Sequence, residues 1–550
     1  MRRSFAALSV LAALAASIRA ATAFAQATEP APAAGAAPAA GVAPAAGAAP
    51  ASDAAAGTGA TSLPKPDAPV TNDSSAPAVP GRDPSRVDGT KVAQGQEPPR
   101  TVGAPSGAHE GRFEFGSYGR VQVGSDLRGG TGRGTNVVAF GPRLVDEQSY
   151  AELELRREDR WNEKVSGRIV ATLGLFPPFF HFTGKSTQAI GVRNLYAQGS
   201  YDRVTMWAGS RMYRGDDIYL FNWWPLDNQN TVGGGVATPI YRSAPEEGTG
   251  RSRYETIAQI HAGQQRLDNP YQFQQVPVVA PFGFGTVDVT KLDRPRTIET
   301  LKVTQFVRPA SGPSGFKAVL YGELHQLAAG SFRDTLTNTD RSLPGDAGFL
   351  AGSQLTWFRG ERDTYATLFL RHARGIAAYD PLAAPITFAL DRTTGSASET
   401  QIAAAGNYEN DYFAVMAAGY VRFFRDGSAA AASTQKYDEG AIAVRPSVFL
   451  GDYFGVAVEG SYQQRRLQML DPNGDGPLTA SVTKLGLIPY FSPSGKGSFK
   501  RPQIRLLYTA SFRNSGARAL YPAEDVFAQR EVEHFAGIST EWWFNFSSYP

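Results

Sequence analysis

The sequence predicts an all-β fold: a transmembrane antiparallel β-barrel of about 18 strands, preceded by a disordered Ala/Pro-rich spacer. Three observations carry this prediction. Short segments of alternating apolar and polar residues recur from residue 111 onward, separated by Gly, Asn, Asp and Pro. No run of even ~18 apolar residues, the length needed for a membrane helix, occurs. The chain of 550 residues has no Cys, which excludes disulfides and thiolate metal sites.

Residues 1–25 are expected to be a secretory signal peptide. They have a basic start, a short apolar run, and the small-residue end Ala23-Phe24-Ala25 before the expected cleavage site. Their three arginines, Arg2, Arg3 and Arg19, account for the formal net charge of +3, so residues 26–550 sum to zero. Export fits an outer-membrane destination.

Residues 26–110 contain no Phe, Trp or Tyr, and the sequence PAAG recurs in them. Such a stretch cannot bury enough apolar surface to offset the entropy lost on ordering. We therefore expect a disordered periplasmic spacer. Two interpretations of its role stay open: it reaches toward the cell wall or a partner, or it is an untethered tail.

From residue 111, each predicted strand has one apolar face and one face that mixes aromatic with charged side chains. Successive side chains of a strand point to opposite faces. In 149–155, SYAELEL, Leu153 and Leu155 share one face, while Tyr150, Glu152 and Glu154 share the other. The same alternation predicts strands in the segments 113–123, 364–372, 411–424 and 503–513. In 411–424 it places Tyr412, Tyr420 and Arg422 on the polar face.

Two architectures produce this alternation. A soluble sandwich turns the apolar faces to a core, whereas a membrane barrel turns them to lipid, where a charge near the midplane costs ~2–4 kcal/mol. The Arg, Glu and Tyr content of the opposite faces, and the alternation of tight with long connections, favour the barrel and a water-filled lumen. Residues 111–546, at about 24 residues for a strand and its connection, give roughly 18 strands.

Seven segments in order resemble the maltoporin family of sugar-specific outer-membrane porins. They are GSYGR (116–120), RLVDEQSYAELEL (143–155), VRNLYAQG (192–199), WAGSRMYRGDDIYLFNWW (207–224), AVRP (443–446), RPQIR (501–505) and STEWWF (539–544). The resemblance implies a trimeric 18-stranded barrel, one loop folded inward to narrow the pore, and a lane of aromatic side chains flanked by ionic residues. A pyranose stacks its C–H face on such rings while its hydroxyls exchange water for Arg, Glu and Asp.

The resemblance assigns site residues position by position. The aromatic lane would comprise Tyr118, Tyr150, Trp224, Tyr365 and Trp543. The polar track and constriction would comprise Arg120, Arg143, Glu152, Arg193, Arg214, Asp217 and Asn222. Each has a structural alternative: the rings would form interface girdles, and the arginines would pair with acids to stiffen the wall.

The sequence departs from the family in two places. Asp438-Glu439-Gly440 stands where the family has a further Trp, with Tyr437 the nearest aromatic. The segment FPPFFHF (176–182) is the one loop comparable to that by which the family reaches a neighbouring subunit. The resemblance therefore implies a sugar porin without fixing linear malto-oligosaccharides as its substrate.

These observations predict an outer-membrane porin for facilitated diffusion of sugars of the maltose or malto-oligosaccharide type. Its partners would be sugars, the outer-membrane bilayer and two further copies in a homotrimer, with possible cell-wall contact through 26–110 and no nucleic acid. No nucleophile motif or metal-ligand spacing occurs, so we expect no catalytic residues, metal or cofactor. A general porin and a mainly structural outer-membrane protein with a cell-wall-binding spacer remain the alternatives.

The end of the chain extends beyond the family's last strand. Alternation places Glu541 and Trp543 toward the lumen and Trp542, Phe544 and Phe546 toward lipid. The final strand is therefore expected to run one pleat longer than in the family.

Overall fold

The computed structural model describes residues 110–546, apart from 147, 178, 185–188, 246–251, 284, 310–313, 335, 360–363, 381–384, 386–391, 429–432, 472–473 and 475. The expected signal peptide (1–25) lies outside the described residues. So do the spacer, of which residue 110 alone is described, and the tail 547–550. Among the residues that the structure describes, no helix has the length and apolar character needed to cross a membrane.

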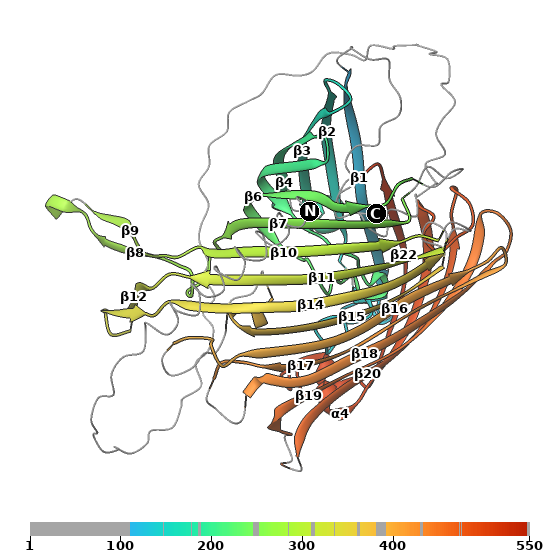
Figure 1. The fold of residues 1–550 in the computed structure, drawn as a ribbon. Coiled ribbons are helices and arrows are strands. Elements are labelled where there is room, and N and C mark those ends of the chain that lie inside the picture. Colours follow the sequence, from blue (N-terminus) through green and yellow to red (C-terminus); the bar gives the residue numbers. More distant parts are fainter. Residues whose placement is uncertain are drawn as a thin grey trace, which may run out of the picture. The chain divides into compact units, whose positions relative to one another are not determined.

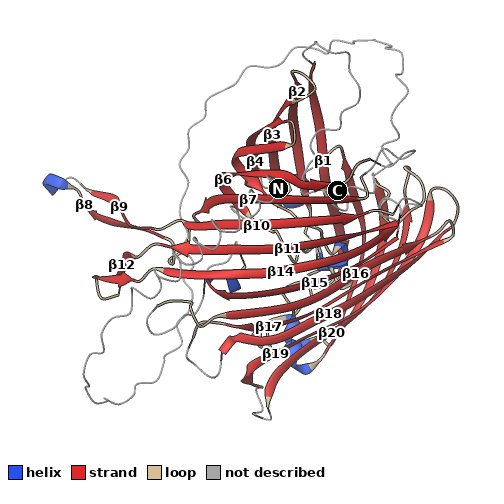
Figure 2. Cartoon of the chain, viewed as in Figure 1, coloured by secondary structure: helices blue, strands red, loops and turns tan. Residues whose placement is uncertain are grey.

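The chain forms one antiparallel sheet of 18 strands, as the alternation predicts (Figures 1 and 2). The strands of this barrel are β1 Glu110–Ser125, β2 Tyr150–Arg160, β3 Val165–Phe176, β4 Ala189–Tyr201, β5 Val204–Met212, β6 Asn230–Arg242, β7 Tyr254–Gln265, β10 Arg296–Val307, β11 Ser314–Leu327, β14 Asp346–Arg359, β15 Thr364–Gly375, β16 Ser398–Glu409, β17 Phe413–Arg425, β18 Ser433–Phe449, β19 Phe454–Leu470, β20 Pro477–Phe491, β21 Gln503–Arg513 and β22 Val532–Phe544.

Pairing of the first strand with the last closes the sheet. Strand β1 pairs with β2 on one side and with β22 on the other, so the barrel has no free edge. In this register Tyr118 lies directly opposite both Glu152 of β2 and Trp543 of β22. Three predicted site residues thus become neighbours although more than 400 positions separate the first from the last.

The remaining elements lie in the connections. Two hairpins, β8 Phe273–Val279 with β9 Thr286–Asp293 and β12 Gly330–Asp334 with β13 Thr339–Leu343, extend beyond the ends of the barrel strands (Figure 1). The short helices are α2 Arg143–Asp146, α3 Phe180–Thr183, η2 Tyr219–Phe221, η3 Pro281–Gly283, η4 Ile376–Ala378, α4 Ser515–Arg518 and α5 Val526–Gln529.

Apolar side chains lie on the outer face of the sheet and polar side chains on the inner face, as the sequence predicts. Leu153 and Leu155 are exposed on the outside, whereas Glu152 and Glu154 of the same strand are buried inside. On β22, Phe544 is 45% exposed, and Trp542 lies over Gly119, where a Cβ atom would come within 2.1 Å of the indole. The apolar face is therefore the lipid face, and the mixed face lines the lumen.

Connections of unequal length give the barrel two different ends. One end has tight turns such as 161–164 and 202–203, and the other has long loops such as 126–149 and 266–295. Short turns mark the periplasmic end of such barrels. Exposed aromatic side chains gather there as an interface girdle: Phe113, Phe115, Trp161, Tyr201, Tyr241, Tyr254, Phe316, Trp357, Tyr408, Tyr412, Phe413, Tyr453, Phe454 and Phe544.

Two sequence-based placements are wrong. Tyr412, expected in the lumen, belongs to the turn before β17 and is 77% exposed, because the strand begins only at Phe413. Phe546, expected on the lipid face, is buried inside the barrel. Strand β22 ends at Phe544, and Asn545 adopts a left-handed conformation (φ 45°) that breaks the alternation and turns the chain inward.

Candidate functional site

Loop L3, residues 213–229 between β5 and β6, folds into the lumen as the resemblance implied. Two ion pairs attach it to the wall. The Nζ atom of Lys302 lies 2.6 Å from an oxygen of Asp227, and that of Lys317 lies 2.7 Å from Asp216. Gln229 adds a hydrogen bond to Glu323 of β11 (2.7 Å). Charges buried in this way persist only when they are paired, so these contacts fix the loop to β10 and β11.

The tip of L3 is the single turn η2. Asn222 closes it in a left-handed conformation (φ 49°, ψ 49°), and its backbone N–H donates to the carbonyl of Tyr219 (3.2 Å). Asparagine tolerates this conformation better than most residues. Asn222, a predicted constriction residue, thereby orients the tip so that Tyr219 faces the opposite wall.

A second loop, L1 (residues 126–149), also enters the lumen, which the sequence did not predict. The N–H of Val137 donates to the side chain of Gln463 (2.9 Å), and Lys484 pairs with Asp146. Phe140 then stacks on Trp223 of L3, with ring centroids 4.3 Å apart and planes inclined by 11°. The two inward loops thus support each other within the barrel.

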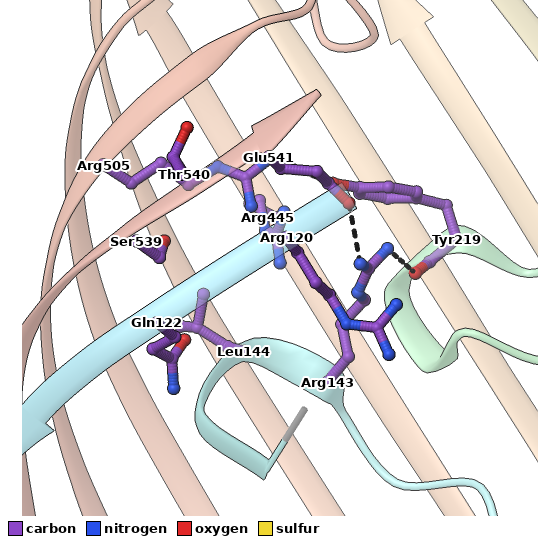
Figure 3. Close-up of a pocket in the computed structure, with 10 residues that line it drawn as sticks. All are labelled: Arg120, Gln122, Arg143, Leu144, Tyr219, Arg445, Arg505, Ser539, Thr540 and Glu541. Atoms are coloured by element: carbon purple, nitrogen blue, oxygen red, sulfur yellow. Dashed lines mark hydrogen bonds and ion pairs between the residues drawn. The ribbon is translucent and has the colours of Figure 1, made fainter. Parts of the chain in front are cut away.

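Where L1, L3 and the wall meet, five residues form what we call the Glu541 cluster: Arg143, Tyr219, Arg501, Arg505 and Glu541. The carboxylate of Glu541 accepts hydrogen bonds from Arg143 (2.7 Å), Arg501 (2.9 Å) and Arg505 (2.5 Å). The hydroxyl of Tyr219 donates to it as well (2.7 Å). Arg143 also donates to the carbonyl of Tyr219 (3.4 Å), which Figure 3 shows.

The Glu541 cluster joins four stretches of chain that are distant in the sequence. Arg143 comes from L1, Tyr219 from L3, Arg501 and Arg505 from β21 and the turn just before it, and Glu541 from β22. Three guanidinium groups surround one buried carboxylate, so the charge of Glu541 is compensated within hydrogen-bond distance. A pocket opens beside the cluster, lined also by Arg120, Gln122, Leu144, Arg445, Ser539 and Thr540 (Figure 3).

Aromatic side chains form a row along the inside of the barrel past this cluster. Centroid separations are 5.2 Å for Phe176–Tyr150, 6.3 Å for Tyr150–Tyr118, 6.4 Å for Trp543–Tyr219, 5.6 Å for Tyr219–Phe499 and 6.4 Å for Phe499–Tyr365. The strand pairing of Tyr118 with Trp543 connects the two halves. We call these seven residues the aromatic row.

Charged groups flank the row at Tyr118 and Tyr150. The Arg120 guanidinium lies 5.8 Å and 5.3 Å from the centroids of these two rings, and its Nη1 donates to the Tyr118 hydroxyl (2.8 Å). The hydroxyl of Tyr150 donates to Glu152, and Arg193 lies 3.4 Å from the same carboxylate. The arrangement places aromatic rings directly beside hydrogen-bond donors and acceptors.

The predicted site residues fall into two groups. Tyr118, Arg120, Arg143, Tyr150, Glu152, Arg193 and Trp543 lie together on β1, β2, β4, β22 and L1, and Tyr365 joins them through Phe499. Arg214 and Trp224 form a pair on L3, with the guanidinium carbon 5.1 Å from the ring centroid, and Arg214 also interacts electrostatically with Glu152 of the first group. Asp217 is a partly buried residue of the same loop, just before its tip.

Sequence reasoning left several contributors out of the predicted site. Phe176 opens the segment FPPFFHF, which the resemblance compared with a loop that reaches a neighbouring subunit, and Phe499 lies in no motif; the two reach the row from the end of β3 and from the turn before β21. Arg501 and Arg505 lie in RPQIR, and Glu541 in STEWWF; both segments supported the resemblance. The alternation that places Glu541 toward the lumen could have indicated this cluster. A carboxylate buried there requires cations from neighbouring strands.

The family model of the LamB porins matches residues 113–544. A comparison with curated protein sequences finds no match. Similar solved structures include OmpT of Vibrio cholerae in its trimer form (12% identity, 80% of this chain and 100% of that chain, TM-score 0.34). Another is the outer-membrane channel DcaP of Acinetobacter baumannii (10% identity, 80% of this chain and 98% of that chain, TM-score 0.39). A third is OccD3 of Pseudomonas aeruginosa (10% identity, 84% of this chain and 99% of that chain, TM-score 0.39).

Proposed function

The chain belongs to the LamB porin family, and on that premise we propose that its aromatic row and the charged groups beside it are the path along which sugars cross the barrel. The protein is a sugar-specific porin of the outer membrane, a channel and not an enzyme. The proposal concerns which residues carry the sugar and how the chain assembles.

The observation that carries the proposal is the continuity of the aromatic row. Neighbouring ring centroids within each half of the row lie 5.2–6.4 Å apart, and Tyr118 and Trp543 are opposite each other on paired strands, so a sugar can contact the next ring before it leaves the last. Stacking buries apolar area without demanding one order of hydroxyl groups, and many weak sites allow both entry and exit. Arg120, Glu152 and Arg193 supply the hydrogen bonds that replace water at the hydroxyls.

The inward loops supply the constriction in this proposal. Loop L3 reaches the Glu541 cluster with Tyr219, and L1 supports it through Phe140. A sugar passing the tip of L3 beside β1 and β2 then stays within reach of the row. Trp224 presents a further ring from L3, held by Arg214.

Saturable block of ion current by sugars tests the proposal. The purified porin is placed in a planar bilayer, and the current is recorded while maltose, longer malto-oligosaccharides and unrelated disaccharides are titrated. A sugar path predicts that the current falls to a plateau with increasing sugar concentration. A general porin predicts only the small linear decrease that follows from solution viscosity, and that result would refute the proposal.

Two further parts of the proposal concern assembly. We propose a homotrimer, as is usual in this family, which unheated gel electrophoresis and chemical cross-linking of intact membranes would detect. We also propose that residues 1–25 are removed on export and that 26–110 form a periplasmic spacer. Mass spectrometry of the mature protein tests the cleavage. A cell-wall pull-down that is unchanged by deletion of 26–110 would exclude a wall-binding role for the spacer.

A further inference from the structure

The chain turns into the lumen directly after its last strand. Strand β22 ends at Phe544, and the left-handed Asn545 redirects the backbone across β1. A Cβ atom at Gly116 would lie 2.2 Å from the carbonyl oxygen of Asn545, so only glycine permits this crossing. The chain therefore has a defined inward path at this point.

The side chain of Asn545 holds this path in place. Its Nδ2 donates to the carbonyl of Phe115 (3.0 Å) and to the carboxylate of Glu114, and its Oδ1 accepts from Arg156 (3.0 Å). The side-chain amide of Asn545 thus bonds to both β1 and β2. We call these three hydrogen bonds the Asn545 latch.

With the chain held in this path, the side chain of Phe546 packs against Tyr118 and Tyr150 of the aromatic row. Phe546 is 9% exposed and packs in one cluster with Tyr118 and Tyr150, which are 3% and 9% exposed. Phe176 and Trp543 border the same cluster. A ring this buried has no free face for a pyranose, so a sugar cannot stack on Tyr118 or Tyr150 until part of the cover moves.

Among the members of this cluster, Phe546 is the one that lies outside the barrel strands. Phe176, Tyr118, Tyr150 and Trp543 belong to β3, β1, β2 and β22, where a shift of the backbone would break ladder hydrogen bonds. Moving Phe546 breaks the latch and leaves every strand pair intact. It is therefore the part of the cover with the lowest cost of opening.

We propose that Phe546 is a gate, an internal occupant of the aromatic row that a sugar must displace from Tyr118 and Tyr150. This inference rests on the proposed function of the row. The gate lowers the apparent affinity for sugar by the fraction of channels in which Phe546 is away from the two rings. Weakening the gate then tightens sugar binding. If Phe546 instead served as one more sugar-stacking ring, weakening it would loosen binding, so the two roles predict opposite signs.

Sugar titration of three variants in planar bilayers tests the gate. Phe546→Leu removes the ring plane, Asn545→Ala removes the latch but keeps the ring, and Phe544→Leu is the control on the lipid face two residues earlier. Each variant is first checked for the folded band that shifts on heating. We expect the first two to lower the sugar concentration for half-maximal block about three- to tenfold, and the control to leave it unchanged.

The possible outcomes separate the gate from the sugar path. Saturable block in the parent protein that is unchanged or weakened in Phe546→Leu and Asn545→Ala would overturn the gate and leave the path standing. Saturable block in the parent that tightens in both variants, but not in Phe544→Leu, supports it. Absence of saturable block in the parent and in all variants would overturn the proposed path and the gate together.

Discussion

Tyr219→Phe isolates the contact that joins the tip of L3 to the barrel wall. The substitution keeps the ring and removes one hydroxyl, which donates to Glu541 (2.7 Å) and accepts from Arg505 (3.1 Å) and Arg501. Glu541 keeps its three arginines, so no charge loses its partner. Hydrogen bonds to charged groups contribute about 1.5–3 kcal/mol each, but the loss of a shared hydroxyl is not additive. We expect the attachment of the tip to weaken by about 1–3 kcal/mol in total.

That loss corresponds to a roughly 5- to 150-fold rise in the population of channels with a detached tip. We expect single-channel recordings to show higher conductance or frequent excursions to a wider state, with weaker sugar block. Tyr213→Phe is the matched control, because its hydroxyl, at the base of the same loop, accepts from Trp207 (2.7 Å) instead. Equal conductance and equal block in Tyr219→Phe and the parent protein would refute the constriction role of the Glu541 cluster.

Three further predictions follow from the loops and the chain end. Trp224→Ala is expected to weaken sugar block by about 1–2 kcal/mol while changing small-ion conductance little, because a ring gives contact area to a sugar and not to a hydrated ion; unchanged block by every sugar would contradict this. Asp227→Asn leaves the buried Lys302 without its carboxylate and should cost about 3–5 kcal/mol, seen as a lower unfolding temperature of the folded band or as increased conductance; a change in neither would show that the ion pair does not hold L3. Deleting Ser547–Pro550 should leave the folded band intact, whereas Phe544→Ser should reduce it, because that ring lies on the lipid face 5.9 Å from Phe115; loss of the band on deletion alone would place the assembly signal in the tail.

Strand periodicity was the most informative sequence signal. A lipid face must be apolar at every second position, so the pattern in segments such as 149–155 fixes both the strand and the direction of each side chain. This is why Glu152, Glu541 and Trp543 could be placed in the lumen from the sequence. The number of strands followed from the length of the domain and the usual ~24 residues for a strand with its connection.

The segments that fold into the lumen, such as L1 and the chain end after β22, were harder to predict because their residues follow no regular alternation. Loop L1 is held by single contacts such as Val137 with Gln463, which joins positions more than 300 residues apart. The end of β22 depends on the backbone conformation of one residue, Asn545, and alternation continued past it placed Phe546 on the wrong side. The Glu541 cluster likewise exists only once the barrel has closed.

The central claim is that sugars travel along the aromatic row, and a crystal structure of the protein with a bound malto-oligosaccharide tests it most directly. The account predicts pyranose rings stacked beside Tyr118, Tyr150 and Trp543, with Phe546 moved away from the first two and sugar hydroxyls bonded to Arg120 or Glu152. Sugar bound elsewhere in the lumen, with the row still covered by Phe546, would contradict it.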